Sequence, residues 1–216
     1  MNAIERAGLQ LQMGKYLTRP QPYIREDRAE GIGGLSRSEL SGRLTELSGQ
    51  GNLAALTLAC GLVLDAQQEG EPVAWITSRE STFYPPDAAE AGIDLGALAV
   101  VRCPDARIVA RAADRLARSG AFGLLVLDLG TNGDVPLPLQ TRLAGLARTH
   151  DIAILLLTEK ADDAPSVGSL VSLRGRAERR CASDGRITCG FRALKDKRRG
   201  PGWNREAAYH GPPGLC

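Results

Sequence analysis

Lysine is missing from most of this chain, because none occurs between Lys15 and Lys160. Any site in that stretch that needs a lysine to hold a phosphate is therefore excluded. Aromatic residues are also scarce, at 4% of the chain, so Leu, Ala and Val must fill the core that a hydrophobic fraction of 43% supplies. No apolar run approaches the roughly 18 residues that a membrane helix needs. These absences indicate a compact protein that has no membrane span.

Metal ligands and secretion signals are absent as well. The five cysteines form no C-x-x-C pair, and His150 and His210, the only histidines, do not lie near two cysteines. A zinc site is therefore not expected, and neither is another metal or a cofactor. The first residues lack the basic start and apolar stretch of a signal peptide. An odd number of cysteines without pairs fits reduced, mostly buried thiols, so we expect a cytoplasmic protein.

Positive charge is concentrated late in the chain, although the formal net charge is only +2. Residues 174–206 contain eleven Lys or Arg against four Asp or Glu, which is a local excess of seven positive charges. Such a block is a solvated face, an anion-binding surface or a disordered basic tail. Four arginines at positions 107, 111, 115 and 118 also share one face of an expected helix, which is usually a hydrated face.

Strand and helix patterns alternate through residues 43–158. Continuous apolar runs at 124–129 and 152–158 are typical of strands that are buried on both faces of a parallel sheet. This alternation predicts an α/β fold with a mainly parallel sheet flanked by helices. The expected strands are 43–47, 73–77, 98–102, 124–129 and 152–158, and the expected helices are 53–68, 86–91, 106–119 and 137–149.

The two ends of the chain differ from this central region. Residues 1–32, with a short possible helix over 4–13, are expected to form an arm, and residues 33–200 the core. Two polar strands at 169–178 and 186–195 are joined by Asp184-Gly185, a good hairpin turn, and form a C-terminal antiparallel hairpin. Residues 201–216 belong to a stretch rich in Gly and Pro and are expected to be an extended tail.

A glycine turn follows the first expected strand, in the setting of a phosphate-binding loop. Such a loop needs backbone N–H groups around the phosphates, a Lys for the terminal ones and a Ser/Thr hydroxyl for Mg²⁺. Gly49 and Gly51 keep the turn, but Leu53 and Ala54 stand where the Lys and the Ser/Thr belong. The turn is either a vestigial anion site or simply a tight strand-to-helix connection.

The order of the segments resembles the RecA ATPase core, and more closely the ImuA family of RecA-like mutagenesis proteins. Residues 42–47 resemble the lead-in to the RecA phosphate loop, and Leu124-Leu-Val-Leu-Asp128 resembles the second nucleotide motif. Residues 115–122 precede that motif as in RecA, and Leu194-Lys-Asp-Lys197 followed by Gly200-Pro-Gly202 resembles a late Lys-Asn-Lys segment. The resemblance covers residues 33–201 and implies a RecA-like core.

The departures from RecA concern its chemistry. Arg79 stands in the place of the glutamate that activates water, with Glu80 one position further on. The two DNA-binding loops of RecA are reduced to residues 130–137 and 160–168, so RecA-type filament formation is not expected. We therefore predict no enzyme activity. Gly49, Gly51, Asn52 and Asp128 form at most a vestigial nucleotide site, in which Asp128 otherwise serves as a structural hydrogen-bond acceptor.

The resemblance implies an accessory subunit of an error-prone lesion-bypass complex. Its partner would be ImuB, a polymerase-like protein, and beyond it an error-prone replicative-type DNA polymerase, with DNA and RecA as further partners. We expect a RecA-like segment of ImuB to add a strand to an exposed sheet edge of this chain. Residues expected at a partner or DNA interface are the basic ones of the late strands: Arg174, Arg176, Arg179, Arg180, Lys195, Lys197, Arg198 and Arg199.

Three other functions stay open on the sequence. SulA-type cell-division inhibitors share this RecA-related family and also lack the phosphate loop, which would make a tubulin-like division protein the partner. The chain could also be a RecA-like ATPase with an unusual site, which Asp128-dependent ATP hydrolysis would reveal. A plain DNA-binding module would show binding that weakens with salt and is lost when residues 195 and 197–199 become alanine.

Overall fold

The computed structural model describes residues 35–49, 53–78, 83–131, 133–181 and 186–210. The expected N-terminal arm, including its possible helix at 4–13, lies outside them. The helices are α2 (Arg37–Leu40), α3 (Leu53–Gln68), α4 (Pro85–Glu90), the 3-10 helix η2 (Leu95–Ala97), α5 (Ala106–Ser119) and α6 (Leu137–His150). The strands are β1 (Arg43–Ser48), β2 (Val73–Ser78), β3 (Leu98–Cys103), β4 (Leu124–Gly130), β5 (Ala153–Thr158), β6 (Leu173–Cys181), β7 (Arg186–Asp196) and β8 (Asn204–His210).

All eight strands belong to one sheet in the order β3-β2-β4-β5-β1-β6-β7-β8. Strands β1 to β6 are parallel to one another. Strand β7 pairs antiparallel with β6, and β8 pairs antiparallel with β7. The predicted fold class is confirmed: the sheet is mainly parallel, and an antiparallel hairpin extends it at the C-terminal end. Strands β3 and β8 are the two edges of the sheet.

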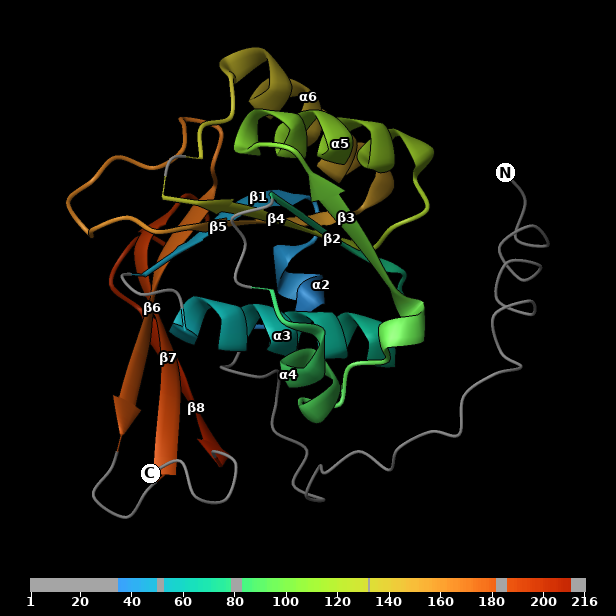
Figure 1. The fold of residues 1–216 in the computed structure, drawn as a ribbon. Coiled ribbons are helices and arrows are strands. Elements are labelled where there is room, and N and C mark those ends of the chain that lie inside the picture. Colours follow the sequence, from blue (N-terminus) through green and yellow to red (C-terminus); the bar gives the residue numbers. More distant parts are fainter. Residues whose placement is uncertain (1–34, 50–52, 79–82, 132, 182–185, 211–216) are drawn as a thin grey trace.

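Helices cover both faces of the sheet (Figure 1). Helix α3, with α2 and α4, lies on one face, and the layer of α5 and α6 lies on the other. Strand β4 shows why both faces can be covered, since Leu124 and Val126 enter the core under α3 while Leu125 and Leu127 enter the core under α5 and α6. A strand that is apolar at every position buries side chains on both sides.

Most predicted elements lie where the sequence placed them. Helices α3 and α5 have the predicted bounds, and the strands of the parallel core differ from prediction by one residue at an end. Helix α4 is shifted by one residue, and the four-residue helix α2 was not predicted. The β6–β7 hairpin is confirmed, but β6 begins at Leu173 because residues 169–172 cross from the β5–β6 loop into the sheet.

Strand β8 corrects the expectation of an extended tail after residue 200. Residues 204–210 pair antiparallel with β7, from Asn204 opposite Arg192 to His210 opposite Arg186. The strand forms because β7 offers an open backbone edge, and a local pattern of turn residues cannot reveal that edge. Pro201 and Gly202 instead belong to the connection between the two strands.

None of the helices in the described ranges is long and apolar enough to span a bilayer. Of the cysteines with described side chains, Cys103 and Cys189 are buried and Cys60 is half-buried, and none of these three forms a disulfide bond. Burial raises the pKa of Cys60 to about 11. Burial also raises the pKa of Cys103, so neither of these two thiols is activated as a thiolate.

Candidate functional site

The predicted nucleotide position lies at the carboxyl end of β1. Ser48 ends this strand and Gly49 follows it, whereas Gly51 and Asn52 lie outside the described residues. The Ser48 hydroxyl donates to the carbonyl of Gly175 at 3.3 Å, and the Gly49 amide donates to the carbonyl of Thr158 at 3.3 Å. Both groups thus bond to neighbouring strands of the sheet.

Asp128 lies near the carboxyl end of β4, on the same side of the sheet as the end of β1, and is 5% exposed. It pairs in register with Thr77 of β2, whose hydroxyl donates to the carboxylate at 3.2 Å. Lys160, the first lysine after Lys15, instead approaches Glu46 at 3.8 Å and donates to the carbonyl of Pro165. Its ammonium is therefore engaged by the β5–β6 loop.

A buried carboxylate that the sequence reasoning missed holds the β5–β6 loop against the sheet. Glu46 of β1 is 0% exposed and accepts hydrogen bonds from the Thr158 hydroxyl at 3.0 Å and the Val167 amide at 2.9 Å. Arg174 adds a second anchor, since it donates to the carbonyls of Ala161 and Ala164. The available signal was a glutamate inside the apolar strand Leu-Thr-Glu-Leu.

The basic residues of the late strands do not form one exposed surface. Arg174 is only 4% exposed, because it faces Glu46 and the β5–β6 loop. Arg176 and Arg180 are ion-paired with Asp162, Glu178 and Glu206 at 2.9 to 3.5 Å. Arg192, which was not among the predicted residues, joins the same network through Asp162 and Glu178.

The other predicted interface residues are divided among several environments. Lys197 donates to the carbonyl of Ser169, and Arg199 pairs with Glu39 at 3.0 Å. Lys195 is half-buried beside Arg174, and burial followed by repulsion from Lys197 lowers its pKa. Arg179 and Arg198 are exposed, and their guanidinium groups make no ion pair within the described part of the chain.

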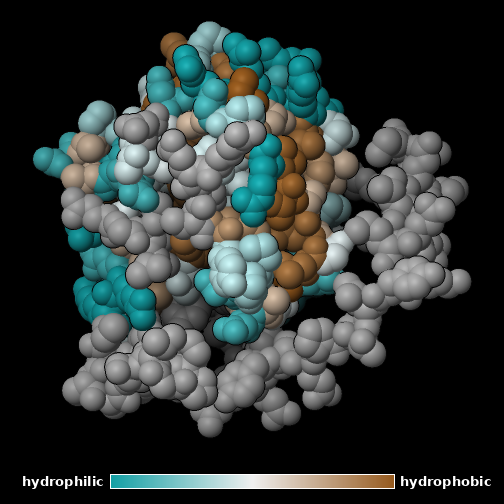
Figure 2. All heavy atoms as spheres, in the orientation of Figure 1, coloured by the Kyte–Doolittle hydropathy of each residue, from teal (hydrophilic) through white to brown (hydrophobic). Residues whose placement is uncertain are grey.

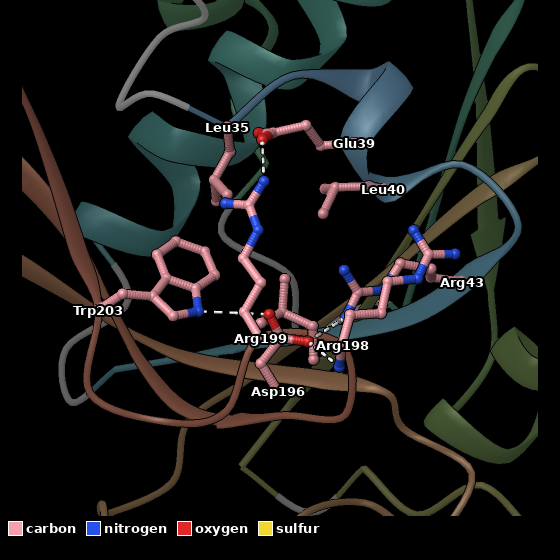
Figure 3. A pocket seen from close by; sticks show the side chains of 9 residues that line it. Leu35, Glu39, Leu40, Arg43, Asp196, Arg198, Arg199 and Trp203 are labelled. Carbon is pink, nitrogen blue, oxygen red and sulfur yellow. Dashed lines mark hydrogen bonds and ion pairs between the residues drawn. The ribbon is translucent and has the colours of Figure 1, made fainter.

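A pocket of about 250 Å³ lies between α2 and the β7–β8 connection, beyond the amino end of β1 (Figure 3). Asp196 organises its floor by accepting bonds from Arg43 at 2.7 Å, the Arg198 amide at 2.8 Å and the Trp203 indole at 3.2 Å. Burial opposes ionisation of Asp196, but these donors together hold its pKa below the usual range.

Glu39 closes the same pocket from α2. It accepts hydrogen bonds from Arg199 and Arg205, which outweigh the effect of burial and lower its pKa. Both guanidinium groups also lie over the ring of Trp203, at 5.5 and 5.6 Å from its centroid. The charged groups of this pocket are largely paired with one another. We therefore interpret the pocket as the contact that attaches α2 to the β7–β8 connection.

The two edges of the sheet differ in polarity. On β3, Ala99, Val100 and Arg102 are exposed, and Val100 is 39% exposed. Figure 2 shows hydrophobic side chains gathered along this edge. On β8, the described side chains are Asn204, Arg205 and Glu206, all polar. Lysine, charge or cover usually protects an edge strand from adding another strand, and β3 has only one charge.

Apolar side chains of α5 border the β3 edge. Asp114 of α5 faces α6, because it pairs with Arg142 at 2.5 Å. By helical spacing, the half-buried residues Ile108, Ala112 and Leu116 lie on the opposite flank, toward β3. The edge backbone and this apolar flank together offer what an added strand and its side chains need.

No cluster of three His, Cys, Asp or Glu residues that could hold a metal ion occurs in the part of the chain that the structure describes. Asp128 is a buried carboxylate near the carboxyl end of β4, and it accepts a hydrogen bond from Thr77 of the neighbouring strand. The β3 edge is exposed and has apolar side chains beside it.

Comparison with known proteins places this arrangement in a family. Residues 18–136 match the family described as the RecA N-terminal domain, a stretch that runs through β4 and ends just before α6. Protein RecA of Chlorobium chlorochromatii is 33% identical over 132 residues, which cover 56% of this chain and 36% of that protein.

Other RecA proteins give the same picture. Protein RecA of Rhodospirillum rubrum is 35% identical over 132 residues, covering 56% of this chain and 35% of that protein. Protein RecA of Kineococcus radiotolerans is 34% identical over 139 residues, covering 59% and 38%. The match thus spans little more than a third of the length of these relatives. With its parallel core in place and more than half of its length matched, the chain belongs to the RecA N-terminal domain family.

Proposed function

We propose that this chain is a non-catalytic RecA-like accessory protein of an error-prone translesion DNA synthesis complex. In this proposal a segment of a polymerase-like partner of the ImuB type adds a strand to β3 and packs apolar side chains against the apolar flank of α5. The partner in turn connects the chain to an error-prone replicative-type polymerase. The observation that carries the proposal is the unprotected apolar edge at β3.

The absence of the phosphate-binding Lys and the Ser/Thr supports a binding role over a catalytic one. Leu53 and Ala54 replace the Lys and Ser/Thr of a phosphate loop, and electrostatic stabilisation by such groups is most of the catalysis in phosphoryl transfer. Lys160 is held by Glu46 and the β5–β6 loop, so it does not substitute for the missing lysine. A RecA-like core that keeps its sheet but lacks these residues can still bind other molecules through its surface.

The edge geometry supports strand addition. An added strand forms backbone hydrogen bonds with the edge, and alternate side chains enter pockets on one face, which gives specificity. Here the face toward α5 offers Val101 on the strand together with Ile108, Ala112 and Leu116 on the helix. The opposite edge, β8, carries charged side chains and is the less suitable site.

The first experiment is affinity purification of the tagged chain from DNA-damaged cells, followed by mass spectrometry. We expect a polymerase-like protein of the ImuB type among the bound proteins. Recovery of a tubulin-like division protein in its place would overturn the proposal in favour of a SulA-type inhibitor.

A second experiment locates the contact. Ala112→Lys should reduce binding to the purified partner at least tenfold, because a charge would enter the apolar surface beside β3. Leu137→Lys, at the start of α6, is the matched control, since Leu137 is 58% exposed and lies away from β3; this change should leave binding unaltered. Equal loss from both variants, or an intact complex after removal of the partner's C-terminal region, would contradict docking at β3.

A further inference from the structure

The outer surface of the α5–α6 layer carries many exposed arginines. Six arginines of the two helices are exposed, against Asp114 within α5 and the cap residues Asp105 and Asp151 at the ends of the helices, which is an excess of three positive charges. Those arginines are Arg107, Arg111, Arg115, Arg118, Arg142 and Arg148. Figure 2 shows hydrophilic side chains over this layer at the top of the molecule.

The aspartate within α5 neutralises only one end of this surface. Asp114 is buried and pairs with Arg118 at 3.3 Å and Arg142 at 2.5 Å. In contrast, no hydrogen bond or ion pair to any described residue engages the guanidinium groups of Arg107, Arg111 and Arg115. These three side chains therefore form an uncompensated stripe along α5.

The late strands also have an excess of positive charge but a different arrangement. On β6 and β7, Arg176, Arg180 and Arg192 already contact the carboxylates of Asp162, Glu178 and Glu206. A polyanion would have to displace these ion pairs before it could gain new ones. The stripe on α5 has no such competing contact, so it is the better anion-binding surface.

The stripe is also unfavourable for the helix itself. Like charges four residues apart repel each other on a helix, and Arg107 stands in the first turn, where the helix dipole disfavours positive charge. A solvated helix face without a ligand gains nothing from this pattern. An anion along the helix would relieve the repulsion.

We propose that the arginine face of α5 and α6 binds the phosphate backbone of a nucleic acid. Successive arginines of the stripe are spaced by about 6 Å along the helix, since each residue rises about 1.5 Å. This spacing is of the same order as the phosphate spacing of a nucleic acid, which is about 3.4 Å per step along the axis of a B-DNA strand. Guanidinium groups bind phosphate oxygens in bidentate fashion.

One further observation favours a nucleic acid over a protein partner. Protein interfaces have an apolar centre with few charges, whereas among the described residues α5 has no exposed large apolar side chain and α6 has one, Leu137, at its first position. Helices α5 and α6 also contain no aromatic residue on which a base could stack. Binding is therefore expected to depend on phosphates and to be independent of sequence.

The test is fluorescence anisotropy of the full chain with a labelled single-stranded oligonucleotide and with its duplex, over a series of salt concentrations. The variant Arg107→Ala/Arg111→Ala/Arg115→Ala should bind at least tenfold more weakly than the wild type. Its slope of log affinity against log salt should be shallower by about 2 to 3, because roughly one counterion is released for each phosphate contact.

The matched control is Arg176→Ala/Arg180→Ala/Arg192→Ala, which removes the same charge from the ion-paired network. We expect it to change affinity less than threefold, with circular dichroism confirming that both variants are folded. Equal losses in the two variants, or a larger loss in the control, would overturn the proposal, as would a wild type that binds neither oligonucleotide.

Poly-glutamate distinguishes a nucleic acid from an acidic protein as the ligand. It should displace the oligonucleotide far less effectively than unlabelled DNA of the same charge. Equal displacement would assign the surface to an acidic protein and overturn the proposal. Partner binding through β3 is measured separately on the same variants and should be unaltered, so the outcome is independent of the proposed docking at β3.

Discussion

Single side chains tie together segments of this protein that are far apart in sequence. Arg43 and Asp196 are separated by 153 residues, and their buried ion pair joins the start of β1 to the end of β7. Glu46 and Val167 are 121 residues apart, and their hydrogen bond fixes the β5–β6 loop. Each contact is buried and charged, so the loss of one partner leaves the other without compensation.

We predict that Asp196→Asn destabilises the protein by about 3 kcal/mol at pH 7, because Arg43 then stays buried without its counter-charge. Urea unfolding measures this change. Asp162→Asn, in the exposed network, is the control and should cost less than about 1 kcal/mol. Similar values for the two variants would contradict a special role for the buried pair.

The same aspartate predicts the response to acid. Its pKa is lowered in the folded state, so its contribution to stability is present above the unfolded pKa of about 3.9 and is lost as the pH falls through the folded value. The stability difference between wild type and Asp196→Asn should therefore shrink below about pH 4. A difference that stays constant down to pH 2 would exclude this linkage.

Glu46→Gln is expected to release the β5–β6 loop. One carboxylate oxygen accepts from Thr158 and the other from the Val167 amide, so an amide NH₂ must face a donor at one of these positions. We expect a loss of about 1 to 3 kcal/mol and faster hydrogen exchange at Val167. Thr45→Val, whose buried hydroxyl bonds to nothing within the described residues, should be nearly neutral. Unchanged exchange at Val167 in Glu46→Gln would contradict the anchoring role.

Among the elements, the two outermost strands have opposite roles. Strand β8 completes the C-terminal sheet and brings Trp203 to 5.1 Å from Phe191, which is buried in the core under α3. Strand β3 ends the sheet on the other side and leaves apolar side chains uncovered. One edge thus stabilises the fold, and the other is available for a partner.

We predict that truncation after Gly200 destabilises the protein by about 3 to 5 kcal/mol, since it removes β8 and the packing of Trp203 on Phe191. Thermal unfolding followed by circular dichroism measures this loss. Truncation after His210 is the control and should leave the transition unchanged. Unaltered stability after the longer truncation would show that residues 201–216 are the detached tail that their composition indicates.

At the scale of the whole molecule, the chain keeps the sheet of its family and lacks the lysine of a phosphate loop. The surfaces proposed for binding lie away from the carboxyl end of β1, along β3 and over the α5–α6 layer. This separation means that partner binding, nucleic-acid binding and nucleotide chemistry can each be tested by a change that spares the other two.

We predict that the wild type shows no ATP hydrolysis above background and that Asp128→Asn is equally inactive. Leu53→Lys/Ala54→Thr should also remain inactive, because Arg79 stands where the family's water-activating glutamate would be. A phosphate-release assay with DNA present measures this. Hydrolysis in the wild type that Asp128→Asn abolishes would instead support the unusual RecA-like ATPase.

The sequence by itself determined the parallel core and the absence of a phosphate-binding lysine. Continuous apolar runs such as 124–129 specify strands that are buried on both faces, and helix periods with Gly and Asp signals specify α3 and α5 between them. These features depend on neighbouring residues, so a linear pattern contains them. The absence of lysine from residues 16–159 is likewise visible without coordinates.

Only the tertiary structure decided which charges are paired and which edges are open. The late block of basic residues stood out in sequence, yet Arg174 is buried and Arg176 and Arg180 meet carboxylates brought by other segments. In sequence the arginines of α5 are typical of an ordinary hydrated face, and only the structure places α6, with two exposed arginines of its own, beside them. Strand order and long-range packing set these contacts, and local periodicity does not encode either.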